Sequence, residues 1–283
     1  MRRDRDHLGE GACWLTEARA LLRVDITAGL VHRWSPARGE QRTDRFDGDV
    51  GAAVPRTGGG FVVAIDRRLI LVDAGGTEHA LAEVEPGRAG NRFNDCRADA
   101  TGRLWAGTMS KTREPGVAAL YRVDPDGACS AVLNGLTISN GICWTPAGDA
   151  MFHIDSTTQR IDRYDYDAAT GELGARLTFA TVDPDHGLPD GICSDEEGGV
   201  WVSLFGGGAL HRYDERGVLS ERVELPVTNP TCPAFGGDDL ATLYVTTARH
   251  RLTREQQRAE PAAGGVLALE PGVRGLPAGA FAG

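Results

Sequence analysis

Four oxygen-bearing side chains recur at matching places along the chain and could together bind a metal ion. Glu10, Asn94, Asn140 and Asp190 each stand 11 or 12 positions ahead of a large apolar residue. The apolar residues are, in the same order, Leu22, Trp105, Phe152 and Trp201. Two carboxylates and two amides form an oxygen-only donor set, which suits Ca²⁺, Mg²⁺ or Mn²⁺ and tolerates Zn²⁺ or Fe²⁺. If the four places are equivalent in a ring of repeats, their side chains converge on one divalent ion.

Each of these residues also has a simpler interpretation. Asn140-Gly141 and Asp190-Gly191 are common hairpin-turn dipeptides, and Glu10 could be an exposed loop carboxylate. The shared phase of all four residues favours the metal-site interpretation. At the same phase, two further repeats carry Val50-Gly51 and Cys232-Pro233, which offer no oxygen ligand from a side chain.

The elements that position these residues follow a long repeat. An apolar strand, often with Arg, ends in an acidic residue six times, at intervals from 41 residues (Asp124 to Asp165) to 56 (Asp214 to Glu270). Six copies of roughly 50 residues match the blades of a β-propeller. The copies end at Asp25, Asp73, Asp124, Asp165, Asp214 and Glu270.

A second pattern alternates with the first. Turns containing Gly precede strands rich in aromatic and β-branched residues, as in Gly102–Trp105 and Gly199–Val202. Two strand signals per repeat favour strands over helices, and one short helix is expected near residues 253–258. We therefore predict an all-β chain, residues 1–283, folded as one six-bladed β-propeller with four-stranded antiparallel blades around a central channel. A sandwich or another barrel does not explain so long a period.

Composition limits the partners. The net charge of −10 argues against a nucleic-acid partner. No run of about 18 apolar residues suggests a membrane helix, and the charged residues 1–7 do not resemble a secretory signal. A cytoplasmic location is the default expectation, with six scattered cysteines that are reduced and mostly buried.

Two further residue types lie near the candidate ligands. Cys13, Cys143 and Cys193 each follow a candidate ligand by three positions, and an odd offset along a strand predicts the opposite face. We expect them to pack between blades as small apolar residues. His186 lies just ahead of Asp190, so it is either a surface-loop histidine or a residue bordering the site.

With these motifs in view, the sequence resembles the family of senescence marker protein 30 (regucalcin), gluconolactonases and related sugar lactonases. The resemblance runs in order across nearly the whole chain, with Cys96 and Ala12 departing from the family's usual Gly and Pro. The matching motifs are 8–11 (LGEG), 91–95 (NRFND), 102–109 (GRLWAGTM), 139–141 (SNG), 189–191 (PDG), 235–238 (FGGD) and 243–246 (LYVT).

The resemblance implies a metal-dependent hydrolase acting on sugar (aldono-) lactones, the small-molecule partner expected here. It implies Glu10, Asn140 and Asp190 as metal ligands, with Asp190 also the general base. It implies Arg92 and Asn94 as the substrate-binding pair. Residues 110–114 (SKTRE) stand where animal members carry acidic residues near the sugar, so substrate preference does not transfer.

The sequence is compatible with more than one mechanism and more than one class of function. The ion polarises the lactone carbonyl while Asp190 accepts a proton from the attacking water, or the ion itself activates the water and Asp190 is only a ligand. A second enzyme interpretation is a promiscuous organophosphate or aryl-ester hydrolase using the same ion. A third is a non-catalytic calcium-binding propeller. The complete ligand set favours an enzyme.

Overall fold

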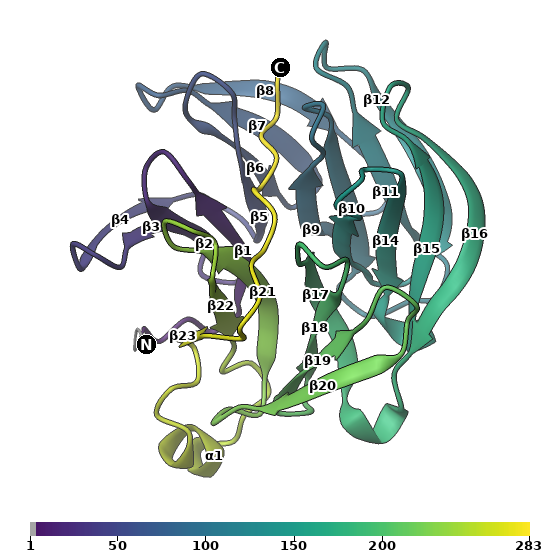
Figure 1. Cartoon of the computed structure of the whole chain (residues 1–283). Helices are drawn as coiled ribbons and strands as arrows, with labels where there is room; N and C mark the ends of the chain where they lie inside the picture. Colours follow the sequence, from purple (N-terminus) through teal and green to yellow (C-terminus); the bar gives the residue numbers. More distant parts are fainter. Residues whose placement is uncertain (1–3) are drawn as a thin grey trace.

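The computed structural model, which describes residues 4–283, is an all-β ring (Figure 1). Six antiparallel sheets surround a central channel, as the predicted six-bladed β-propeller requires. Five sheets have four strands and the last has three. The strands are, blade by blade: β1 (Gly9–Leu15), β2 (Ala20–Asp25), β3 (Leu30–Ser35), β4 (Glu40–Arg45); β5 (Val50–Pro55), β6 (Phe61–Ile65), β7 (Arg68–Val72), β8 (Glu78–Glu83); β9 (Asn91–Ala98), β10 (Leu104–Ser110), β11 (Ala118–Val123), β12 (Cys129–Leu136); β13 (Ser139–Trp144), β14 (Ala150–Asp155), β15 (Arg160–Asp167), β16 (Glu172–Thr181); β17 (Leu188–Ser194), β18 (Val200–Phe205), β19 (Ala209–Tyr213), β20 (Leu219–Glu224); β21 (Pro230–Gly236), β22 (Thr242–Thr247), β23 (Val266–Leu269).

The first strand of each blade lines the channel, and these six inner strands hold the ring together. Each inner strand contacts the next one along the chain, and β21 contacts β1 to close the circle. The inner strands are nearly all buried, whereas the outer strands β4, β8, β12 and β20 are largely exposed. Apolar clusters between neighbouring blades make up the core, as in the cluster of Leu22, Val24, Val63 and Ile65 between the first two blades.

The two repeat patterns fall on different strands of the blades. The Gly-led pattern lies on second strands, as Trp105 on β10 and Trp201 on β18 show. The pattern ending in an acidic residue lies at the third strand in five blades, but its first copy, Leu22–Asp25, is out of phase because it lies on the second strand, β2. An apolar strand that ends in an acid does not reveal its rank within a blade, so the pattern alone does not separate this second-strand copy from the other five.

The short helix expected near residues 253–258 is α1 (Arg254–Ala259). A capping box begins it: the Thr253 hydroxyl accepts from the amide of Gln256, and the Gln256 side chain accepts from the amide of Thr253. Two 3₁₀ turns, η1 (Ser156–Thr158) and η2 (Pro184–His186), lie in loops of the fourth blade and after it. In residues 4–283 no helix is long and apolar enough to cross a membrane. Residues 1–7 are predicted not to form a secretory signal. Of these, residues 1–3 lie outside the described residues.

The C-terminal strap, residues 274–283, crosses one mouth of the channel (Figure 1, yellow). The strap begins after the sixth blade. There the carbonyl of Arg274 accepts a hydrogen bond of 2.8 Å from the amide of Glu196, which belongs to the fifth blade. At its other end Phe281 pairs with Arg56 of the second blade and is fully buried among side chains of the second and third blades. The strap therefore ties together blades on opposite sides of the ring.

Candidate metal centre

A β-bulge near the start of each inner strand positions the candidate ligands. The pairing of inner and second strands shifts register between Glu10 and Cys13, between Asn140 and Ile142, and between Pro189 and Ile192. The other three inner strands carry the same irregularity, which in β9 falls at Asn94. A bulge re-aims a side chain out of the regular alternation. The four predicted positions are thus equivalent because each lies at the same bulge of its inner strand, near the same mouth of the channel.

The two glycines after the ligands also have a structural role. Asn140-Gly141 lies inside β13 and Asp190-Gly191 inside β17, so neither pair forms a hairpin turn. A Cβ on Gly141 would lie 2.7 Å from the carbonyl oxygen of Asp190, and one on Gly191 would lie 2.8 Å from the backbone of Cys232. These close approaches bring neighbouring inner strands together, and the ligands with them.

Three of the predicted residues meet at this mouth. The Asn140 amide nitrogen donates to Asp190 Oδ1, and it donates to Ser156 Oγ at 3.1 Å. The Glu10 carboxyl is near enough to Asp190 for a side-chain hydrogen bond and for charge repulsion. Asn140 and Asp190 are buried, whereas Glu10 keeps part of its surface open to solvent.

The predicted substrate-binding pair lies beside them. Arg92 donates from Nη1 to the carbonyl of Phe93 at 2.8 Å and to Asn94 Oδ1 at 2.9 Å. Asn94 Nδ2 donates in turn to the carbonyl of Ser139 at 3.0 Å, next to Asn140. Within residues 4–283 these are the only acceptors bonded to the Arg92 guanidinium, so its Nε and Nη2 groups are left to bind a ligand.

The two carboxylates of this site lie close together and repel each other. Burial, then the charges of Asp190 and Asp95, raise the pKa of Glu10 well above its ordinary value. Burial also raises the pKa of Asp190, although hydrogen bonds from Asn140 and Glu10 and the Arg92 charge oppose the shift. Two carboxylates this close cannot both ionise cheaply, and a divalent ion would remove that cost.

These residues fit a hard divalent cation. No three His, Cys, Asp or Glu side chains are grouped for metal binding between residues 4 and 283, so the set depends on the Asn140 amide. That amide directs its NH₂ to Asp190, while its Oδ1 accepts from the amide of Gly141 at 3.2 Å. Rotating the side-chain amide by half a turn would present Oδ1 to an ion held between Glu10 and Asp190.

Sequence reasoning missed a buried ion pair next to this site. Asp95 follows Asn94 within the same bulge, and Arg97 lies 3.1 Å from its carboxylate. Burial raises the pKa of Asp95, and Arg97 lowers it in part. The charge of Asp95 acts on both Glu10 and Asp190. The signal available in the sequence was Asp95, the acid that directly follows Asn94 at the repeat position.

The cysteine prediction is confirmed. Cys13 and Cys143 are buried in apolar clusters between blades, and Cys193 packs against a third such cluster. All six cysteines are free, and four are buried. The ring of His186 packs edge to face against His211, with centroids 5.3 Å apart, in the loop at η2. It is half-buried there.

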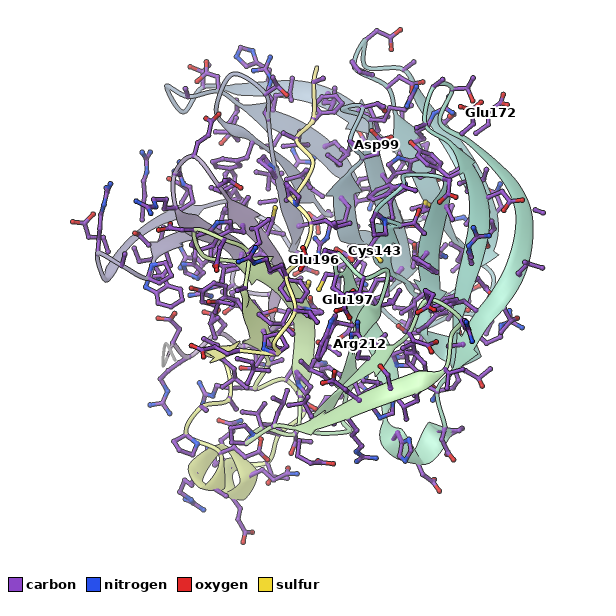
Figure 2. All side chains as sticks on the ribbon, viewed as in Figure 1. Asp99, Cys143, Glu172, Glu196, Glu197 and Arg212 are labelled. Atoms are coloured by element: carbon purple, nitrogen blue, oxygen red, sulfur yellow. The ribbon has the colours of Figure 1, made fainter. Side chains whose placement is uncertain are left out.

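The opposite end of the channel has a different character. A cavity of about 760 Å³ lies there, bordered by turns between first and second strands and roofed by residues 276–282 of the C-terminal strap. Cys13, Cys96, Cys143 and Cys193 border it, together with Trp14 and other apolar side chains. Figure 2 shows Cys143 near the middle of the ring, in contrast with Glu172 at the outer edge. Among residues 4–283, the one side chain with a full charge along its wall is Arg97, which forms the ion pair with Asp95.

Comparison with known proteins agrees with this architecture. Residues 8–249 match a family model described as the SMP-30/gluconolactonase/LRE-like region. Regucalcin of Gallus gallus is 36% identical over 288 residues, which cover 99% of this chain and 96% of that protein. A solved regucalcin of Agrobacterium tumefaciens, described as a calcium-binding protein, superposes with a TM-score of 0.94 at 31% identity, covering 99% of this chain and 95% of that one. A solved luciferin-regenerating enzyme gives 0.92 at 30% identity, covering 98% and 96%.

Proposed function

Because this chain belongs to the SMP-30/gluconolactonase/LRE-like family, we propose that it hydrolyses sugar lactones with the help of one divalent metal ion. The observation that carries the proposal is the meeting of Glu10, Asn140 and Asp190 at one mouth of the channel, where two carboxylates with raised pKa values lie beside an amide. The family description supports lactone hydrolysis in general. Metal dependence and the residue roles below are our proposal.

Glu10, Asn140 and Asp190 would hold the ion through side-chain oxygens. When bound, such an ion supplies a Lewis acid for a carbonyl oxygen and leaves positions open for water and substrate. Ca²⁺, Zn²⁺, Mn²⁺, Mg²⁺ and Fe²⁺ all remain compatible with an oxygen-only set.

The chemistry needs a proton acceptor and a donor for developing negative charge. As water attacks the lactone carbonyl, Asp190 accepts its proton, and the same proton passes to the ring oxygen when the carbon–oxygen bond breaks. Arg92 donates from its free Nε and Nη2 groups to the carbonyl oxygen or to ring hydroxyls. Asn94, held by Arg92 and Ser139, presents its amide beside the ring.

A direct test uses metal-stripped protein reloaded with single ions. Hydrolysis of five-membered aldono-lactones, which open slowly in water, is followed in a pH-stat. We expect turnover to disappear on stripping and to return with one or more ions. Full turnover by the stripped protein would overturn the metal-dependent mechanism.

The test also separates the competing functions. Phosphotriesters and aryl esters in the same panel reveal an esterase or phosphotriesterase that shares the site. A relative is described as calcium-binding, so calorimetric titration of Ca²⁺ into the stripped protein is run in parallel. Tight Ca²⁺ binding without turnover of any ester would favour the non-catalytic calcium-binding function and exclude ours.

A further inference from the structure

Arginines from opposite blades surround the mouth that holds the candidate metal ligands. Arg113 lies in the loop between β10 and β11 of the third blade, and Arg251 lies in the loop between β22 and β23 of the sixth. In a ring of six blades the third and the sixth face each other across the axis. Arg92, on β9, lies beside the ligands. We name these three residues the arginine cluster.

Backbone hydrogen bonds place both loops next to the site. The amide of Lys111 donates to the carbonyl of Gly90 at 2.9 Å, two residues ahead of Arg92, and the amide of Arg113 donates to Ser110 at 3.0 Å. On the other side the amide of His250 donates to the carbonyl of His7 at 2.8 Å, three residues ahead of Glu10. The two imidazole rings also pack edge to face, with centroids 5.2 Å apart.

The arginine cluster has no acidic partner of its own. Within residues 4–283, none of its three guanidinium groups lies within 4.0 Å of a carboxylate. The neighbouring Lys111 differs, because it lies 2.7 Å from Asp49 and 3.5 Å from Asp66. The charges of these two acids also act on Arg92, without an ion pair. A divalent ion would offset the charges of Glu10 and Asp190. The mouth then keeps an excess of positive charge in a chain whose net charge is −10.

The charges of the cluster act on one another across the mouth. Burial, then the Arg251 charge, lowers the pKa of Arg113, while Asp190 raises it. Burial lowers the pKa of His250, and His7 and the charges of all three arginines lower it further.

We propose that the lactones hydrolysed at this site carry a second, anionic group, a carboxylate on the sugar chain, which Arg113 and Arg251 bind at the mouth while the lactone carbonyl faces the ligands. The substrate class is thus the monolactones of sugar diacids rather than neutral aldono-lactones. A guanidinium binds a carboxylate through two parallel hydrogen bonds and loses less on partial desolvation than an ammonium does. This inference rests on the proposed lactone hydrolysis and adds the charge of the substrate to it.

The experiment compares two substrates that differ in one group. The five-membered lactones of gluconic and glucaric acid have the same ring and differ at carbon 6, which is a hydroxymethyl group in one and a carboxylate in the other. With metal-loaded enzyme we expect kcat/KM at least about 10-fold higher for the glucaric lactone, since a charge-assisted hydrogen bond contributes about 1.5–3 kcal/mol. The preference should shrink as salt is raised, because the mouth is open to solvent.

Three variants assign the preference to residues. Arg113→Gln and Arg251→Gln should each raise KM for the glucaric lactone about 10-fold and change kcat/KM for the gluconic lactone less than twofold. Arg216→Gln, which removes the same charge from an exposed turn between β19 and β20, should change neither. Equal kcat/KM for the two lactones, or equal losses on both in Arg113→Gln, would overturn the inference while leaving lactone hydrolysis intact.

A binding measurement keeps the two proposals separate. Glucarate and gluconate are titrated calorimetrically into metal-loaded protein, so that no turnover is needed. We expect glucarate to bind at least about 10-fold more tightly, and to lose this advantage in Arg113→Gln. If neither lactone is hydrolysed but glucarate retains the advantage, lactone hydrolysis fails and the anion site stands. If the two acids bind equally, the anion site fails whatever the turnover.

Discussion

The two ends of the channel are built from the same strands and have opposite chemistry. On β1, β13 and β17, Glu10, Asn140 and Asp190 lie at the open mouth, and a cysteine follows each of them by three positions toward the strapped end. The mouth gathers carboxylates, amides and guanidinium groups, whereas the strapped end gathers thiols and apolar side chains around a cavity. The bulge between the two ends is what permits the change, because it lets one strand present a ligand at one end and a packing residue at the other.

This comparison shows how a repeat fold can gain a site without losing its core. Each inner strand contributes packing toward the strapped end, and four of the six place a carboxylate or amide side chain at the mouth, three of which are the proposed metal ligands. Two carboxylates are buried together at the mouth, where the pKa values of Glu10 and Asp190 are raised. The cavity at the strapped end is lined mainly by uncharged side chains, with Arg97 on its wall, and the chain's own C-terminal strap crosses it.

The strongest test of this division compares two residues of β17. We expect Asp190→Asn to lower kcat/KM by about 10³-fold, because it removes the proton acceptor and a charged ligand. Cys193→Ala, three residues along, should stay within twofold of the parent enzyme, because Cys193 only packs against apolar side chains. Lactone hydrolysis in a pH-stat gives both values, with circular dichroism to confirm that both variants fold. A comparable loss in Cys193→Ala would place function at both ends.

The next test measures stability instead of activity. Phe281→Ala should lower the free energy of unfolding by about 3–5 kcal/mol, the usual cost of emptying a buried phenylalanine site, because Phe281 is fully buried in the cluster between the second and third blades. Urea unfolding measures the loss. The kcat/KM of the folded fraction should be unchanged, because the strap lies at the other end of the channel from Asp190. A fall in kcat/KM at a temperature where the variant is fully folded would show coupling between the two ends.

A third test uses pH to detect the buried charge at the mouth. The folded pKa values of Glu10 and Asp190 are raised, so above the ordinary carboxyl pKa the folded metal-free protein binds more protons than the unfolded chain. Stability that is present at acid pH is then lost as the pH rises through the folded pKa values. We expect the Tm of metal-free protein to fall by several degrees between about pH 5 and pH 8.

Two controls make this result specific. The metal-loaded protein should show a flatter profile, because the ion stabilises both carboxylates in the charged form. In metal-free Glu10→Gln the slope should shrink, since one of the two acids is gone. A metal-free profile as flat as the loaded one would mean that the two carboxylates do not oppose each other at the mouth.

The sequence predicted most of the architecture because the repeat carries it. Six periods with two strand signals each determine the number of blades, and the phase of Glu10, Asn140 and Asp190 predicted their meeting at one mouth. The bulge could not be predicted from the sequence, because no residue type marks it. Asn140-Gly141 and Asp190-Gly191 are equally compatible with hairpin turns. Only close packing of Gly141 and Gly191 against neighbouring strands distinguishes the two cases.

What sequence could not supply were contacts between distant segments. Phe281 reaches the second blade across the whole ring, and Arg113 faces Arg251 only because opposite blades share an axis. Neither relation has a local pattern. The out-of-phase first copy at Leu22–Asp25 has the same origin, since a strand's rank within its blade depends on its neighbours.

The mildest test labels thiols and leaves the enzyme active. Burial raises the pKa of Cys13 to about 11 and that of Cys143 to about 12, so at pH 8 very little of either thiol is the reactive thiolate. Cys129, on the outer strand β12, is exposed. We expect an alkylating reagent at pH 8 to modify Cys129 first, as mass spectrometry would show, with lactone hydrolysis unchanged. Unfolding in urea should expose all six thiols. Rapid labelling of Cys143 in the folded protein would show that the strap admits solvent and reagent to that end, and would remove the contrast between a sealed end and an open mouth.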